Sequence, residues 1–299
     1  MIEVKGVSKT FEGMDALKCV DLHIKRGSIY GLLGTNGAGK TTLLKILAGL
    51  YKEDKGVVSI NEQSIYENEA LKDRVMFLSD FPSFFAHYTV RQMANVYKNL
   101  YHQWDEERFQ ALQEVFELDI HKKIQRFSKG MQRQVAFWLA LSTKPDVLIL
   151  DEPFDGLDPV MRRKVKNLIL QDVAEREMTV LVSSHNLREV EDFCDYIGVL
   201  HHGTMLFERD LDELKSDIHK VQVAFKGEVP PDFFEAFNVL YTEARGSVML
   251  YIVRGEEEDI LSHMNVHKPV LFDLLPLSLE EIFIYEMGEV GYAIKNILV

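Results

Sequence analysis

The sequence has few cysteines and no long apolar run. It contains only Cys19 and Cys194, whose separation does not suit a metal site, and we expect two reduced, buried thiols of a cytosolic chain. No apolar stretch approaches the ~18 residues that span a bilayer, and the first residues lack a signal-peptide pattern. If a membrane matters to this chain, a partner must supply the spanning segments.

Positive charge is also scarce. The 34 lysines and arginines are outnumbered by 47 aspartates and glutamates, which gives a formal net charge of −13 at pH 7. Such a surface is unfavourable for nucleic acid as the main partner. Apolar residues make up 46% of the chain, enough for packed cores. A length of 299 residues suggests about two domains.

One glycine-rich stretch has the pattern G-x-x-x-x-G-K-T between a strand-like and a helix-like segment. Its residues are Gly34, Thr35, Asn36, Gly37, Ala38, Gly39, Lys40, Thr41 and Thr42. Such a turn directs backbone N–H groups and the positive end of a helix dipole at one point, which suits a phosphate chain. We predict that Lys40 reaches the β- and γ-phosphates of a nucleotide and that the Thr41 hydroxyl binds Mg²⁺. The alternative is an ordinary glycine-rich turn.

The residues around this turn predict an α/β domain. An antiparallel β-layer is predicted at residues 2–7, 16–24 and 57–60. Phe11 is expected in the loop between the first two strands, and another strand is expected over 75–78. Three amphipathic segments then predict a helical insertion over about 86–142, whose first helix begins with a capping box of Thr89 and Gln92.

Two later strands end in polar side chains. Four apolar residues over 147–150 indicate a strand buried on both faces, and Asp151 and Glu152 follow it directly. The next buried strand, over 179–184, ends at His185. Because α/β sheets bind ligands beyond the carboxyl ends of their strands, we expect these polar side chains at the ligand-binding edge.

Taken together, these motifs resemble the ATP-binding subunit of an ABC transporter over residues 1 to about 215. The stretch from Gly34 to Thr42 is similar to Walker A, and Leu148 to Glu152 are similar to Walker B with its catalytic glutamate. The other matches are the adenine-stacking aromatic at Phe11, the signature segment at 127–132, the D-loop at 154–158 and the switch histidine at His185. The resemblance implies a P-loop ATPase that uses ATP and Mg²⁺.

The resemblance also assigns a role to each residue. Asp151 would orient Mg²⁺, and Glu152 would position the attacking water or take its proton. His185 would contact the γ-phosphate and the water. Ser128 and Gly130 of the signature segment would face a γ-phosphate held by another subunit. Two ATP molecules would then be sandwiched between two subunits, so we expect a second copy or a paralogue as a partner.

Two positions depart from the family pattern. The signature reads F-S-K-G-M instead of L-S-G-G-Q, with Lys129 in place of a glycine, a form similar to that of exporter-type members. Asp80 stands where the family has a glutamine that contacts Mg²⁺. We expect Asp80 to meet the metal through a water. The alternative is an exposed loop aspartate without a metal role.

Three aromatic residues, Phe81, Phe84 and Phe85, come soon after Asp80. Aromatic residues in one loop usually belong to a core, whereas in this family the transmembrane partner docks here, and both interpretations stay open. The resemblance implies transmembrane permease subunits as partners and no nucleic acid. It places the chain in the cytoplasm, on the inner face of the cell membrane.

The last part of the chain, residues 220–299, predicts a small α+β accessory domain. Strands are predicted at 221–226, 239–244, 248–253 and 269–273, and helices at 231–237 and 256–264. This β-α-β-β-α-β order is that of a ferredoxin-like domain. Ser278 and Glu281 form a capping box for a last helix. We expect a structural or dimer-supporting role rather than a small-molecule regulatory site.

The leading hypothesis is therefore the ATP-hydrolysing subunit of a membrane transport complex, with export favoured by the signature variant and the accessory domain. The alternative is a soluble ABC ATPase that acts in translation or DNA maintenance. Such proteins have tandem domains or long coiled-coil arms, which this sequence lacks. A P-loop kinase of small molecules would leave the signature segment and His185 unexplained. The transported substrate is not encoded in any of these motifs.

Overall fold

The computed structural model describes residues 1–226 and 237–289. The chain forms two compact units. Unit 1 consists of Met1–Asn186 and Phe193–Glu208, and unit 2 of Leu187–Asp192 and the residues from Arg209 onward. The division into domains at 1–215 and 220–299 stays a prediction. No helix of the described ranges is long and apolar enough to span a membrane.

Unit 1 contains a six-stranded sheet in the order β10-β9-β3-β8-β7-β6. Its strands are β3 (Ile29–Leu33), β6 (Val75–Leu78), β7 (Val147–Asp151), β8 (Thr179–Ser184), β9 (Tyr196–His201) and β10 (Thr204–Asp210). The five strands from β9 to β6 pair in parallel. Strands β3, β7 and β8 are buried along their whole length, as expected for parallel strands covered on both faces. Parallel pairing brings their carboxyl ends to one edge.

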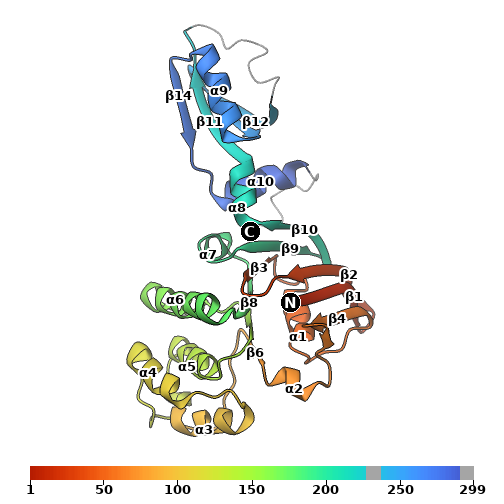
Figure 1. Ribbon diagram of the computed structural model, residues 1–299, viewed down its shortest axis with the longest axis vertical. Helices are drawn as coiled ribbons and strands as arrows, with labels where there is room; N and C mark the ends of the chain where they lie inside the picture. The colour runs from red at the N-terminus through yellow and green to blue at the C-terminus, as the bar shows by residue number, and fades with distance from the viewer. Residues whose placement is uncertain (227–236, 290–299) are drawn as a thin grey trace. The chain divides into compact units, whose positions relative to one another are not determined.

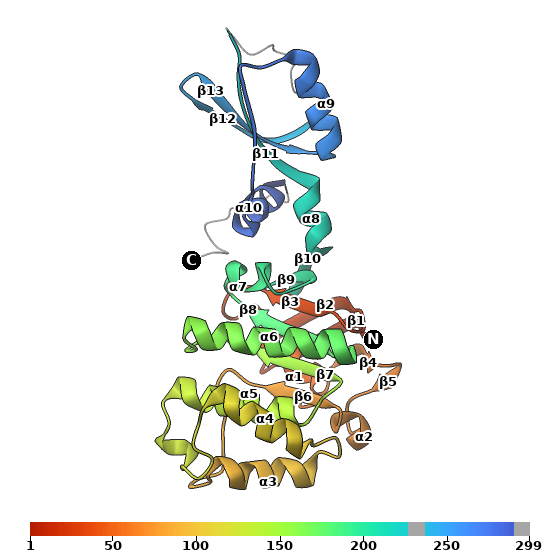
Figure 2. The same cartoon turned by 60° about the vertical axis from the view of Figure 1, so that its left-hand side comes forward.

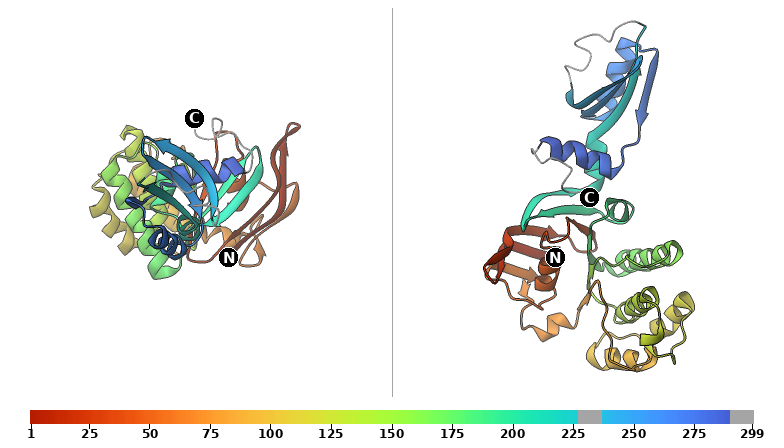
Figure 3. Two further views of the ribbon diagram at one scale, coloured as in Figure 1. Left: turned by 90° about the horizontal axis from the view of Figure 1, so that it is seen from above. Right: turned by 180° about the vertical axis from the view of Figure 1, so that it is seen from behind.

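The second sheet of unit 1 is antiparallel, in the order β2-β1-β4-β5. Its strands are β1 (Ile2–Phe11), β2 (Met14–Ile24), β4 (Lys55–Ile60) and β5 (Gln63–Ser64). Helix α1 (Lys40–Leu47) contributes Leu43, Leu44 and Leu47 to one apolar cluster with residues of both sheets. The helix therefore joins the two layers through a shared core. Figure 3 shows the antiparallel layer and helices α3 to α6 on opposite sides of the six-stranded sheet.

Two expectations for the antiparallel layer are wrong. Phe11 is the last residue of β1, not a loop residue, because a two-residue turn at Glu12 and Gly13 pairs it with Met14. Both turn residues have positive φ, 47° and 83°, as in the type I′ turn that closes tight hairpins. Cys19 is exposed rather than buried, since it has a φ of 48° where the β1–β2 register shifts.

The predicted helical insertion is present in unit 1. It contains α3 (Val90–Leu100), α4 (Glu106–Phe116), the short 3₁₀ helix η1 (Ile124–Arg126) and α5 (Lys129–Ser142). Figure 2 shows these helices grouped below α6 (Pro159–Arg176), and the short α2 (Glu69–Lys72) precedes β6. The capping box of Thr89 and Gln92 forms as predicted, and Asp158 caps α6 ahead of Pro159. Trp138 of α5 stacks on Phe109 of α4, with ring centroids 4.7 Å apart.

A buried carboxylate joins three helices of unit 1. Asp172 of α6 is fully buried, and its two oxygens lie 2.6 Å from Nη2 of Arg108 and 3.0 Å from Nη2 of Arg176. The Nε of Arg108, on α4, also donates to the carbonyl of Leu141 on α5, at 2.9 Å. A single acidic side chain therefore compensates two mostly buried guanidinium groups.

Replacing Asp172 with alanine should lower the free energy of unfolding of unit 1 by about 3–5 kcal/mol, because two buried arginines would lose their counter-charge. Urea unfolding followed by tryptophan fluorescence measures this effect, since both tryptophans lie in unit 1. The control is Glu175→Ala on the exposed face of the same helix, which should stay within about 0.5 kcal/mol of the wild type. Equal unfolding midpoints for the two variants would contradict this account.

Unit 2 contains a four-stranded antiparallel sheet in the order β12-β13-β11-β14. Its strands are β11 (Ile218–Ala224), β12 (Asn238–Arg245), β13 (Val248–Arg254) and β14 (Leu271–Leu275). Its helices are α7 (Leu187–Glu191), α8 (Leu211–Asp217), α9 (Glu257–His267) and α10 (Leu279–Glu289), labelled in Figure 1. The helix predicted at 231–237 lies outside the described residues except for Phe237. The predicted Ser278–Glu281 capping box forms.

Candidate functional site

The predicted phosphate-binding loop connects β3 to α1 in unit 1 and borders a cavity of about 610 Å³. Gly39 precedes α1 with a φ of 108°, and a Cβ at this position would lie 2.5 Å from the carbonyl oxygen of Ala16. Only glycine fits there without strain. The cavity is lined by Ala16, residues 35–37, 39–42 and 79–81, Lys45, Asp151 and Glu152.

Lys40 is a buried cation of this cavity. Its side chain is only 6% exposed, and its Nζ donates to the carbonyl of Gly34 at 2.6 Å. The same Nζ lies 3.1 Å from Oε1 of Glu152, the residue after β7. Since a buried ammonium group requires compensating acceptors, these contacts fix Lys40 beside the loop.

Asp151, the last residue of β7, accepts two hydrogen bonds. The hydroxyl of Thr41 donates to Oδ2 at 2.8 Å, and that of Ser183 donates to Oδ1 at 2.7 Å. Asp151 is buried, and both Thr41 and Asp151 line the cavity. A hydroxyl and a carboxylate are the kind of hard oxygen ligands that Mg²⁺ prefers.

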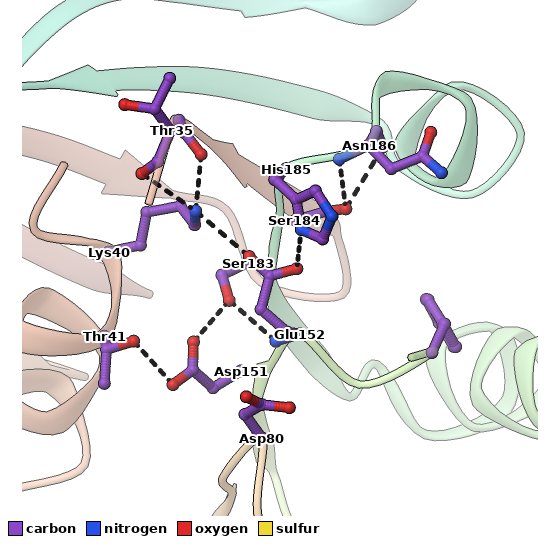
Figure 4. A network of polar contacts seen from close by, with 12 residues as sticks. Thr35, Lys40, Thr41, Asp80, Asp151, Glu152, Ser183, Ser184, His185 and Asn186 are labelled. Atoms are coloured by element: carbon purple, nitrogen blue, oxygen red, sulfur yellow. Dashed lines mark hydrogen bonds and ion pairs between the residues drawn. The ribbon is translucent and has the colours of Figure 1, made fainter. Parts of the chain in front are cut away.

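Glu152 lies next to Asp151, with a left-handed φ of 44°. Its backbone N–H donates to Oγ of Ser183 at 3.0 Å, and its Oε2 lies 2.9 Å from Nδ1 of His185. Figure 4 shows how the side chains of β7 and the end of β8 meet those of the loop after β3. A carboxylate held between a lysine and a histidine beside a polar cavity is suited to positioning or deprotonating a water.

Asp80 also borders the cavity, and its carboxylate is paired with the side chain of Arg133. Arg133 of α5 donates through Nη2 to Oδ1 of Asp80 at 2.9 Å and to the backbone carbonyl of Asp80. Through Nη1, Arg133 donates to the backbone carbonyl of Glu152. The structure therefore brings Asp80 to the edge of the site through an arginine that the sequence did not single out.

The remaining predicted residues lie outside the cavity lining. Phe11 is 39% exposed and makes an edge contact with Tyr51, with ring centroids 5.5 Å apart. Ser128 is exposed and caps α5 by accepting a hydrogen bond from the N–H of Met131. Gly130 packs so tightly that a Cβ would lie 2.5 Å from the carbonyl oxygen of Gly156 in the predicted D-loop.

The aromatic loop after β6 is partly exposed. Phe81 and Phe85 expose 76% and 56% of their surface, and Phe84 is half-buried. The core interpretation of this loop is therefore wrong for Phe81 and Phe85. Phe85 contacts Tyr88, with ring centroids 5.3 Å apart, so an apolar surface extends along the loop.

Two site residues were missed by sequence reasoning. Ser183 connects Asp151 to the backbone of Glu152, and Arg133 connects Glu152 to Asp80. Signals for both exist in the sequence. Two adjacent serines, Ser183 and Ser184, end an apolar strand, and Arg133 and Gln134 directly precede the apolar run at 135–141. Buried polar residues of this kind are typically held by specific hydrogen bonds.

Comparisons with known proteins agree with this fold. The ABC transporter family model matches residues 17–155. The ABC transporter ATP-binding protein YtrB of Bacillus subtilis is 32% identical over 288 residues, which cover 96% of this chain and 98% of YtrB. The bacitracin transport ATP-binding protein BcrA of Bacillus licheniformis is 32% identical over 221 residues, 72% of this chain and 71% of BcrA. The dimeric ATP-binding cassette MJ0796, solved in a post-hydrolysis state with ADP and Pi, is similar with a TM-score of 0.64 and 25% identity, covering 71% of this chain and 99% of that chain.

Fold and comparisons together define unit 1 as a P-loop ATPase of mixed α/β architecture. The chain belongs to the ABC transporter ATP-binding proteins, and it is the ATPase subunit that powers a membrane transport complex. The resemblance noted in the sequence is thereby confirmed at the level of family, fold and reaction.

Ser183→Ala should lower ATP turnover by about 10- to 100-fold, the usual effect of removing a group that orients a site residue. The substitution leaves one Asp151 oxygen and the Glu152 N–H without a partner. Steady-state phosphate release measures the turnover. Ser142→Ala is the matched control, because Ser142 is equally buried but donates only to the carbonyl of Trp138, outside the cavity. Wild-type turnover in the Ser183→Ala variant would contradict this role of Ser183.

Proposed function

We propose that this chain binds ATP with Mg²⁺ in the cavity beside Lys40 and hydrolyses it at an interface between two subunits. The observation that carries the proposal is the convergence of Lys40, Thr41, Asp151 and Glu152 on one cavity, with His185 on Glu152. The loop of residues 34–42 supplies backbone N–H groups for the phosphates, as the sequence predicts. Phe11 is proposed as the stacking residue for adenine, which is consistent with its partial exposure.

The donor set fits Mg²⁺. Thr41 and Asp151 would hold the ion, and Asp80 would meet it through a water, since all three line the cavity with oxygen groups. Bound Mg²⁺ would supply charge stabilisation of the phosphates. The hydrogen bonds from Thr41 and Ser183 already hold the Asp151 carboxylate in one orientation.

Glu152 is the residue proposed to position the attacking water or to accept its proton. Its side chain is 14% exposed and lines the cavity, and Lys40 and His185 contact its two oxygens. His185 is half exposed and is proposed to contact the γ-phosphate and the water. Lys40 would compensate the negative charge of the β- and γ-phosphates.

A second subunit is proposed to complete the site. Ser128 is exposed and lies at the N-terminus of α5, a helix of 14 residues. The positive end of its dipole favours a phosphate there. Because neither Ser128 nor Gly130 lines the cavity of its own chain, they are available to a γ-phosphate held by another copy or by a paralogue. The similar cassette MJ0796 is dimeric.

The aromatic loop is proposed as the surface that docks a transmembrane permease subunit. Phe81, Phe85 and Tyr88 expose apolar surface in one loop. A contiguous exposed apolar patch of this kind marks an interaction site. This contact would hold the chain at the inner face of the cell membrane. Lys129 in the signature segment and the presence of unit 2 favour an export complex.

Unit 2 is proposed to be a ferredoxin-like accessory domain. Its strand order β12-β13-β11-β14 and the packing of α9 on one face agree with a β-α-β-β-α-β chain order. Ile260 and Met264 of α9 form an apolar cluster with Val221, Val223 and Val253 of the sheet. We propose a structural or dimer-supporting role for this domain.

Glu152→Gln should bind ATP normally but hydrolyse it at least ~10²-fold more slowly, the scale of lost general-base catalysis. Because the nucleotide is not consumed, the variant should accumulate as an ATP-bound dimer on gel filtration. Glu114→Gln, an exposed substitution on α4, is the control and should behave as the wild type. Normal turnover in the Glu152 variant would remove this residue from the proposed role.

A further inference from the structure

Arg133 is a buried arginine with all its polar contacts at the edge of the ATPase site. Its side chain is 11% exposed, on the first turns of α5. Nη2 donates to the carbonyl and to Oδ1 of Asp80, and Nη1 donates to the carbonyl of Glu152. One guanidinium group therefore connects three chain segments, namely α5, the loop after β6 and the residue after β7.

We propose that Arg133 is a positioning residue for ATP hydrolysis, which acts by holding the backbone of Glu152 and the loop at Asp80 in fixed register. This proposal rests on the role proposed for Glu152 and adds a second residue, Arg133, that positions it. Arg133 does not line the cavity, so its effect on the reaction is transmitted through Glu152 and Asp80.

The backbone of Glu152 needs such support. A φ of 44° is a sparsely populated, strained conformation for a residue with a side chain, and it persists only where the surrounding structure holds it. The N–H of Glu152 is held by Ser183, and Arg133 holds its carbonyl. With both backbone polar groups of Glu152 fixed, its carboxylate is directed at Lys40 and His185.

The pairing with Arg133 also gives Asp80 a structural role. A buried guanidinium group is costly unless it is paired, and the Asp80 carboxylate supplies the opposite charge. Arg133 is its only hydrogen-bond donor within residues 1–226 and 237–289. The planar fork of an arginine can contact two carbonyl groups and a carboxylate at once, whereas a lysine presents a single charged nitrogen. The geometry therefore requires arginine, not merely a positive charge.

Arg133→Lys tests the proposal in the full-length chain. We expect ATP affinity, measured by titration, to change by less than about 3-fold, while the turnover per bound nucleotide falls by about 10- to 100-fold, the scale of a small displacement of a reacting group. In the Glu152→Gln background the same substitution should lower the residual single-turnover rate by less than about 2-fold, since residues that act through one group are not additive.

Arg108→Lys is the matched control. Arg108 is also a mostly buried arginine that bridges a carboxylate and a carbonyl, but it lies outside the cavity lining and pairs with Asp172. This variant should lose stability in urea yet keep its turnover per bound nucleotide. If Arg133→Lys does not fold by tryptophan fluorescence, Arg133→Gln replaces it, with the same expected division between affinity and turnover.

Three outcomes overturn the proposal. The first is an unchanged turnover per bound nucleotide in Arg133→Lys. The second is an equal loss of turnover when Arg133→Lys is made in the wild type and in the Glu152→Gln background. The third is a loss of turnover in Arg108→Lys as large as that in Arg133→Lys. Either of the first two outcomes would show that Arg133 does not act through Glu152. The third would show that Arg133 affects turnover only through the stability of the fold. Failure of the proposed function has a different signature, because Glu152→Gln would then turn over normally whatever residue occupies position 133.

Discussion

The site depends on Glu152, which contacts two buried cations, Lys40 and Arg133. Lys40 faces the carboxylate of Glu152 at 3.1 Å, and Arg133 contacts the carbonyl of the same residue. Burying either charge without a partner would cost several kcal/mol. The parallel pairing of β3, β8 and β7 makes both contacts possible, because it brings the loop after β3, Ser183 and Glu152 to one edge of the sheet.

Several elements of unit 1 contribute residues to the site at this edge of the sheet. Lys40 and Thr41 begin α1, Asp151 ends β7 and Glu152 follows it, and Ser183 lies near the end of β8. The Ser183 hydroxyl couples two of these residues, because it donates to the Asp151 carboxylate and accepts a hydrogen bond from the backbone N–H of Glu152. Ser128 and Gly130 of the signature segment are predicted phosphate contacts that do not line this cavity, which is the reason for proposing a second subunit.

Local patterns in the sequence predict much of this. The glycine spacing of the loop, the apolar strand before Asp151 and the cap at Asp158 each depend on neighbouring residues, and the structure has the corresponding elements. The partners of Arg133 and Ser183 could not be assigned because they lie 53 and 32 residues away, and no local pattern encodes such contacts. Phe11 was misplaced since Glu12-Gly13 is not among the common sequences of a type I′ turn. Cys19 was misplaced since a register shift has no apolar signature.

The central claim is that the loop of one subunit and the signature segment of another form each ATP site. The most direct test mixes Lys40→Ala with Ser128→Arg protein under conditions where subunits exchange. Either variant alone should be inactive, whereas the mixture should regain about a quarter of wild-type turnover, because half of the randomly formed dimers carry one intact composite site. A mixture that is no more active than its components, despite demonstrated exchange, would contradict a site shared between two copies of this chain.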